Sequence, residues 1–218
     1  MSQVRPEELS HSDGVILVKT ARACVEAKFR GEKPKPPINV SEKLKKLGAA
    51  FVTIETFYGY DKRELRGCIG YIQPVKPLIE AVCDVAIEAA FSDPRFPPLA
   101  PEELDRVTFE VSVLGPLEPL PKDPRERVKA FKIGVHGLVV RRGFFQGLLL
   151  PQVPIEYGWD EETFLAETCV KAGLPPYCWL EEDTEFYRFS ARVWREREPK
   201  GDIEERNLVE EARSKRLT

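Results

Sequence analysis

Cys68 lies between two glycines in a segment with the composition of a β-strand. Arg66 stands two positions before it, and a nearby cation favours the thiolate, which is the nucleophilic form of cysteine. Glycine inside a strand usually marks a bulge or the close approach of a ligand or another backbone. The segment therefore predicts a reactive thiol in an opened strand, with a buried structural cysteine as the alternative. It reads Leu65-Arg66-Gly67-Cys68-Ile69-Gly70.

Proton transfer would require a partner for this thiol. The sequence has two histidines, and His136 stands close to two glycines that permit a close approach to the backbone. A cysteine and a histidine are the minimum for a thiolate–imidazole pair. A carboxylate would orient the imidazole, and Glu156 and Glu110 are the candidates.

Charge and motif content argue against several other classes of function. The chain of 218 residues has 33 basic and 36 acidic residues, a net charge of −3, so nothing electrostatic favours general nucleic-acid binding. Glycine-rich phosphate loops and the H-E-x-x-H motif are absent from the sequence. Neither histidines nor cysteines have a familiar zinc spacing. We therefore expect no metal and no cofactor.

Cysteine usage and hydropathy suggest a cellular location. The five cysteines are odd in number and lack a C-x-x-C pair, which argues against a disulfide framework. No apolar run approaches the roughly 18 residues of a membrane span, and the first ten residues lack the apolar core of a signal peptide. We expect a cytoplasmic protein that does not contact membranes. The 32% charged residues and 19 prolines resemble the composition of a thermophile's protein.

Hydrophobic periodicity predicts an α+β fold with an antiparallel sheet packed against helices. A proline-rich stretch at residues 116–124 is interpreted as the boundary of a second lobe. The prediction is two unequal lobes with a cleft between them. Helices are expected at residues 10–30, 77–90, 123–131 and after Asp160; strands are expected at residues 50–57, 64–72, 107–114, 135–141, 144–150 and 185–193.

Alternation along these strands assigns side chains to faces. It places Arg66, Cys68 and Gly70 together, opposite Leu65, Ile69 and Tyr71. The same polar face would hold Thr53 and Glu55 from the first strand and Thr108, Glu110 and Ser112 from the third. Such a face is ordinarily solvated in an antiparallel sheet; in the functional interpretation, the second lobe covers it.

An ordered set of motifs resembles the AMMECR-domain family, which is named after a human chromosomal region and has archaeal and bacterial members. The similarity covers about residues 10 to 195. Besides the cysteine segment, it consists of Asp93-Pro94-Arg95-Phe96-Pro97-Pro98-Leu99, Gly134-Val135-His136-Gly137-Leu138, Leu150-Pro151-Gln152-Val153 followed by Glu156, Gly158 and Trp159, and Lys171 with Gly173.

The resemblance implies a two-subdomain α/β fold in which residues 1–118 and 181–218 form the larger subdomain and residues 119–180 the smaller. It implies no settled reaction. In bacteria the domain occurs alongside Memo-like and radical-SAM proteins, which implies a modification pathway. Transfer of the family's motifs residue by residue implies one shared polar set, made up of Arg66, Cys68, Asp93, Arg95, His136 and Glu156.

The first hypothesis is an enzyme, or an enzyme-like protein, that acts on an anionic small molecule or a modified substrate. Cys68 would be the nucleophile, His136 and Glu156 would handle protons, and Arg66 and Arg95 would hold the anion. Asp93, Gly67 and Gly70 complete the predicted binding residues. The alternative is a non-catalytic adaptor that binds a protein segment or RNA through the same cleft. RNA binding would require a basic strip around Arg188, Arg192 and Arg195.

Overall fold

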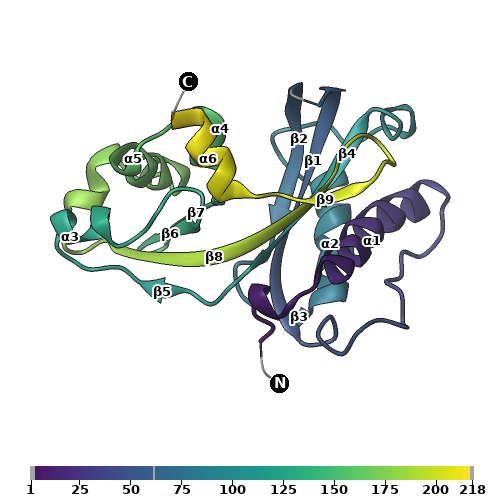
Figure 1. Cartoon of the computed structure of the whole chain (residues 1–218), viewed down its shortest axis with the longest axis horizontal. Helices are drawn as coiled ribbons and strands as arrows, with labels where there is room; N and C mark the ends of the chain where they lie inside the picture. The colour runs from purple at the N-terminus through teal and green to yellow at the C-terminus, as the bar shows by residue number, and fades with distance from the viewer. Residues whose placement is uncertain (1–2, 61, 217–218) are drawn as a thin grey trace. The chain divides into compact units, whose positions relative to one another are not determined.

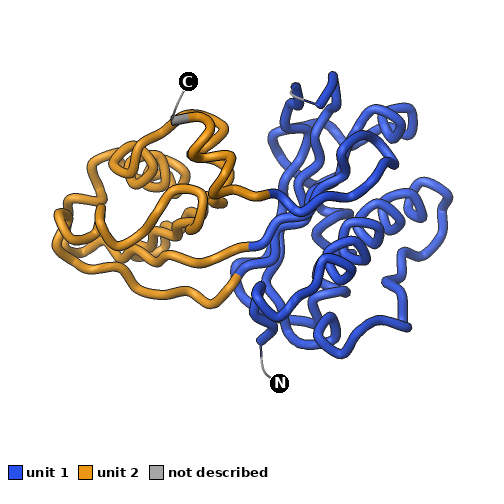
Figure 2. Tube along the Cα trace, in the orientation of Figure 1, with its two compact units in different colours: residues 1–114, 192–206 blue, residues 115–191, 207–218 orange. Residues whose placement is uncertain are grey.

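The fold is α+β, as predicted, with antiparallel strands and packed helices (Figure 1). The structure is a computed structural model that describes residues 3–60 and 62–216; the ends of the predicted larger subdomain and one position of its first hairpin lie outside the described residues. Two compact units are formed, one by residues 1–114 and 192–206 and the other by residues 115–191 and 207–218 (Figure 2).

The first unit contains two long helices, α1 (His11–Phe29) and α2 (Leu78–Phe91), which lie side by side (Figure 1). Ser10 begins α1 with a capping box. Its hydroxyl accepts the Asp13 N–H at 3.2 Å, and the Asp13 carboxylate accepts the Ser10 N–H at 2.9 Å. Both predicted helices are confirmed within one residue at each end.

The sheet of this unit has the strand order β2-β1-β4, formed by β2 (Lys62–Gly70), β1 (Leu47–Gly59) and β4 (Val107–Leu114). Its apolar face carries side chains such as Val52, Phe109 and Val111, which are fully buried in the core with α1 and α2. Short elements complete the unit: η1 (Pro6–Glu8), β3 (Lys76–Pro77), η2 (Pro101–Glu103) and β9 (Ile203–Glu205).

A β-bulge at Arg66 corrects the predicted faces of β2. Ile54 pairs with Gly67 and Glu55 pairs with Leu65, so Arg66 is the extra residue in the ladder. The extra residue reverses the alternation, and Leu65 lies on the same face as Cys68 rather than opposite to it. The predicted polar grouping of Thr53, Glu55, Thr108, Glu110 and Ser112 is confirmed by the register of β1 with β4.

The second unit has an antiparallel ladder of β7, β6 and the first part of β8, covered by helices (Figure 1). Its core contains Leu138, Phe164 and Phe186. Its elements are β5 (Glu118–Pro119), α3 (Pro124–Lys129), β6 (His136–Arg142), β7 (Phe145–Leu149), α4 (Val153–Tyr157), α5 (Glu161–Lys171), η3 (Pro176–Leu180) and α6 (Leu208–Arg216), while β8 (Glu185–Glu196) contributes residues to both units.

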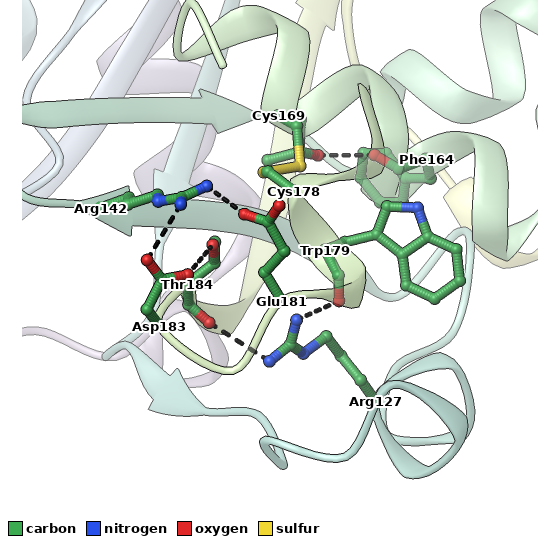
Figure 3. The surroundings of a disulfide bond; sticks show 10 residues. Arg127, Arg142, Phe164, Cys169, Cys178, Trp179, Glu181, Asp183 and Thr184 are labelled. Carbon is green, nitrogen blue, oxygen red and sulfur yellow. Dashed lines mark hydrogen bonds and ion pairs between the residues drawn. A yellow bond between two sulfur atoms is a disulfide. The ribbon is translucent and has the colours of Figure 1, made fainter. Parts of the chain in front are cut away.

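Two disulfides overturn the expectation that none would form. Cys24 of α1 is bonded to Cys83 of α2, and Cys169 of α5 to Cys178 of η3 (Figure 3). Cys24, Cys83 and Cys169 are buried. Their pairing was missed because helix packing brings together cysteines 59 positions apart in the sequence. Cys68 lies outside both bridges.

Buried arginine contacts stabilise the region around the second disulfide (Figure 3). The Arg127 guanidinium is buried, and it donates to the carbonyls of Pro121 at 3.0 Å and Thr184 at 3.2 Å, and to that of Trp179. These contacts join α3 to the segment that follows η3. Burial lowers the pKa of Arg127.

Candidate functional site

Both backbone polar groups of Cys68, its N–H and its carbonyl, are hydrogen-bonded to the loop that follows α2. Its N–H donates to the Asp93 carboxylate at 2.8 Å, and its carbonyl accepts from Arg95 Nη2 at 3.3 Å. β2 is the edge strand of its unit, so these two side chains satisfy backbone groups that would otherwise remain open at the edge. The loop therefore both protects the edge and fixes the position of Cys68.

Asp93, which accepts the Cys68 N–H, is buried, with only 4% of its surface exposed. Besides Cys68, its carboxylate accepts from Arg95 Nε at 2.9 Å, Nη2 at 2.7 Å and the Arg95 backbone N–H at 3.1 Å. Burial alone would raise the pKa of Asp93, but these hydrogen bonds outweigh burial and lower the pKa to about 2. Asp93 is thus a permanently ionised structural carboxylate at neutral pH.

Arg66 makes a second connection between β2 and the region after α2. Its guanidinium donates to Glu103 at 2.7 and 3.0 Å and to the Pro97 carbonyl at 3.0 Å. Hydrogen bonding from Arg66 also lowers the pKa of Glu103. The charge of Arg66 is therefore engaged by a carboxylate, and its predicted role in binding an anion stays a prediction.

The two glycines of the segment permit close packing. A Cβ on Gly67 would lie 2.2 Å from the carbonyl oxygen of Ala89 in α2. A Cβ on Gly70 would lie 2.2 Å from the Phe51 ring. Gly67 and Gly70 are therefore required by the fold itself, and ligand contact at either position stays a prediction.

The sulfur of Cys68 faces a polar row across three strands. Thr53 of β1 pairs with Cys68 on one side and with Glu110 of β4 on the other. The Thr53 hydroxyl donates to Cys68 Sγ at 3.3 Å. Such a donor stabilises the thiolate, in which sulfur carries the negative charge after the thiol loses its proton.

Glu55 lies one step along β1 from this row and has unusual electrostatics. Burial and the neighbouring Glu110 raise its pKa to about 7, partly offset by Arg63. Arg63 Nη1 is 3.7 Å from Glu55 Oε2, whereas Glu110 is paired with Arg206 at 2.9 Å. Glu55 can therefore exchange a proton near neutral pH, as a general base must.

The predicted histidine lies in the second unit. His136 Nδ1 accepts the backbone N–H of Lys132 at 3.0 Å, which leaves Nε2 to carry the proton of a neutral ring. Burial and then Arg188 lower the pKa of His136, and Glu118 acts in the opposite direction. The hydrogen bond shown at Nδ1 is therefore to backbone, and the carboxylate that influences the ring is Glu118.

Glu156 lies in α4 of the second unit with its side chain exposed, and its carbonyl accepts from Lys215 Nζ at 3.0 Å. The contacts within each unit thus define two groups. Cys68, Arg66, Asp93 and Arg95 belong to one, and His136 and Glu156 to the other. A joint proton-transfer system of Cys68, His136 and Glu156 stays a prediction.

Two residues near the thiol, Thr53 and Glu55, were not among the predicted site residues. Strand alternation had already placed both on the polar face. The signal that would have singled them out is the register, because Thr53 pairs with Cys68 only when Arg66 is bulged. A bulge cannot be recognised from alternation alone.

Arginines of the predicted basic strip are paired with carboxylates. Arg188 lies 2.8 Å from Glu118, Arg192 lies 2.6 Å from Glu205, and Arg195 lies 2.9 Å from Glu204. Nucleic-acid affinity depends on uncompensated positive charge. The arrangement therefore gives no support to RNA binding by these three residues.

Among residues 3–60 and 62–216, no three histidine, cysteine or acidic side chains gather in a way that could hold a metal ion. Within the same residues, no helix is long and apolar enough to cross a membrane.

Comparison with known proteins places the chain in a family. The AMMECR1 family model matches residues 18–194. The chain belongs to the AMMECR1 family. The matched range includes Cys68, His136 and Glu156, so all three lie within the AMMECR1 domain.

The AMMECR1 relatives include archaeal proteins of similar length. A protein of Aeropyrum pernix is 52% identical over 212 residues, which cover 97% of this chain and 91% of that protein. Protein MK0488 of Methanopyrus kandleri is 48% identical over 210 residues, covering 94% and 99%. The crystal structure of the uncharacterized protein PH0010 from Pyrococcus horikoshii superposes with a TM-score of 0.85 at 47% identity, covering 89% of this chain and 96% of that chain.

Proposed function

We propose that this AMMECR1 protein is a thiol-dependent enzyme with Cys68 as its nucleophile. The observation that supports this most is the pair of hydrogen bonds that join the Cys68 backbone to Asp93 and Arg95, combined with the Thr53 hydroxyl that donates to Sγ. A nucleophile held by rigid surroundings and provided with a donor is preorganised for attack. The other four cysteines are held in disulfides, so Cys68 is the thiol available for this chemistry.

The substrate would be a small molecule with a carboxylate or phosphate group. Arg95 would hold that group, because its side chain is 42% exposed and contacts the Cys68 carbonyl. Arg66 is less suited, since its side chain is only 12% exposed. A guanidinium presents paired donors that match either anion.

We propose that the protein acts in the cytoplasm. Disulfides are rare in most cytosolic proteins, but intracellular proteins of hyperthermophilic archaea are an exception. The relatives include proteins from Pyrococcus, and the composition of this chain resembles that of thermophiles. Two internal bridges are therefore compatible with a cytoplasmic enzyme.

Metabolite profiling of three strains tests the enzymatic proposal: wild type, a deletion, and a Cys68→Ser replacement at the native locus. An enzyme that depends on the thiol predicts the same accumulated anionic compound in the deletion and the Cys68→Ser strain. Accumulation in the deletion alone, with the Cys68→Ser protein present at normal level, would show that the thiol is dispensable.

A protein-binding adaptor is the second candidate, and one observation favours it. Phe144 and Phe145, at the turn between β6 and β7, are 106% and 53% exposed. Exposed aromatic side chains are typical of protein-binding surfaces. In this case a Phe144→Ser/Phe145→Ser strain would reproduce the deletion phenotype, while the Cys68→Ser strain would resemble wild type.

A further inference from the structure

We infer that Glu55 is the proton acceptor for the Cys68 thiol. This inference rests on the proposed thiol-dependent function. In the step, the S–H bond of Cys68 breaks and an O–H bond forms on the Glu55 carboxylate. The electron pair stays on sulfur, and the resulting thiolate attacks the substrate. The proton remains on Glu55 until it is returned to the product or to solvent.

The register of the sheet makes the two residues diagonal neighbours on the same face of adjacent strands. Cys68 pairs with Thr53, and Glu55 lies two positions further along β1, on the same face. Diagonal neighbours of this kind are separated by about 7–8 Å, which long side chains can span. The bulge at Arg66 creates this relationship, because without it the side chain of Cys68 would point to the other face.

Among four carboxylates around β2 that form ion pairs with arginine, Glu55 has the longest distance to its arginine partner. Asp93 and Glu103 are bound to arginines at 2.7 Å, and Glu110 at 2.9 Å. Arg63 lies 3.7 Å from Glu55, and within residues 3–60 and 62–216 the buried Oε2 accepts no hydrogen bond. Among these four carboxylates, only Glu55 could take up a proton without breaking a close ion pair.

The charged groups that act on Glu55 come from several elements. Glu110 of β4 opposes its ionisation, while Arg63 of β2, Arg195 of β8 and Arg206 beyond β9 favour it. Burial is the largest influence, and together these effects raise the Glu55 pKa to about 7. Near neutral pH the carboxylate and the carboxylic acid are both populated, as proton exchange requires.

Because Cys68 and Glu55 share one proton in this proposal, the rate of Cys68 alkylation should depend only weakly on pH. While the pair holds one proton, the fraction of Cys68 present as thiolate is set by proton sharing and does not change with pH. Alkylation should therefore vary much less than about tenfold between pH 7 and 8. Without an acceptor, an ordinary thiol reacts about tenfold faster for each pH unit in this range.

Iodoacetamide alkylation of the folded, non-reduced protein tests this inference, with Cys68 modification measured by mass spectrometry from pH 6 to 9. The variants are Glu55→Gln, Glu55→Asp and Glu64→Gln. Glu55→Asp keeps a carboxyl but shortens its reach by one methylene. Glu64→Gln is the matched control, since Glu64 is exposed and adjoins Leu65 on the opposite face. Circular dichroism establishes that each variant is folded.

The expected result is a plateau for wild type and Glu64→Gln, and a steep slope for both Glu55 variants. A steep slope in wild type, equal to that of Glu55→Gln, would overturn the role of Glu55. Failure of Cys68 to react in any folded protein, with full reaction after denaturation, would instead overturn the proposed nucleophile.

Discussion

Asp93 and Glu55 are carboxylates of the same unit whose pKa values shift in opposite directions. Both are desolvated, which alone raises a carboxyl pKa. Asp93 accepts hydrogen bonds from Arg95 and from the Cys68 N–H, and its pKa falls to about 2. Glu55 lies 3.7 Å from Arg63, and the attraction of Arg63, Arg195 and Arg206 does not offset burial and the like charge of Glu110, so its pKa rises to about 7. Hydrogen bonding thus separates a structural carboxylate from one that can exchange protons.

Asp93→Asn should destabilise the protein at neutral pH and much less in acid. A folded-state pKa of about 2, below the ordinary 3.8, contributes stability that is present above pH 3.8 and is lost as pH falls toward 2. The shift corresponds to about 2 kcal/mol in the free energy of unfolding. Urea unfolding at pH 7, 4 and 3 measures it, with Asp105→Asn, at an exposed ion pair, as the control. A pH-independent difference between Asp93→Asn and wild type would contradict the assignment.

Glu55→Gln should stabilise the protein at pH 8. Glu55 has a raised pKa in the folded state, so between pH 4.5 and 7 the folded chain holds a proton that the unfolded chain has lost. Stability of the wild type therefore falls as pH rises through this window, by about 3 kcal/mol at most. Unfolding free energies of the two proteins should converge near pH 4.5 and diverge toward pH 8. Parallel pH curves would show that the Glu55 pKa is not raised.

At the scale of elements, β2 packs against α2 and is covered along its open edge by the loop that follows α2. Towards α2, Gly67 leaves no space for a side chain because the Ala89 carbonyl lies against it. Along its open edge, the loop after α2 supplies Asp93 and Arg95 in place of another strand. The cysteine segment is thus a packing and edge-protection motif that also presents Sγ to the polar face.

Gly67→Ala should disrupt this arrangement. Its Cβ would lie 2.2 Å from the backbone oxygen of Ala89, and a helix backbone cannot rotate away as a side chain can. Overpacking costs about 1–3 kcal/mol, and the upper end is expected where the obstacle is backbone. Denaturant unfolding against Glu64→Ala, an exposed substitution on the same strand, measures the difference. Equal stability of the two variants would mean that β2 and α2 can separate without cost.

Periodicity predicted the helices, the strands and the polar face, because these depend on local patterns of burial. It placed Cys68, Thr53, Glu55 and Glu110 on one face, but it did not reveal the bulge at Arg66, which also brings Leu65 to that face. The partner of Arg66, Glu103, lies 37 residues away, and the disulfide partner of Cys24 lies 59 away. Such pairings depend on tertiary packing, which the local pattern of a single sequence does not specify.

At the scale of the whole molecule, each unit has its own hydrophobic core and its own disulfide. Cys24–Cys83 lies in the first unit and Cys169–Cys178 in the second. The three tryptophans are divided in the same way, since Trp194 is buried in the first core while Trp159 and Trp179 pack against the second. Intrinsic fluorescence can therefore report on each unit separately.

Removal of each disulfide should destabilise its own unit first. Loop length predicts losses of about 4 kcal/mol for Cys24→Ala/Cys83→Ala and about 3 kcal/mol for Cys169→Ala/Cys178→Ala. In a Trp159→Phe/Trp179→Phe background, Trp194 reports the first unit; in a Trp194→Phe background, the other two report the second. The urea midpoint of the matching reporter should fall more than that of the other. Equal shifts of both reporters for both disulfides would instead show that the AMMECR1 domain unfolds as one cooperative body.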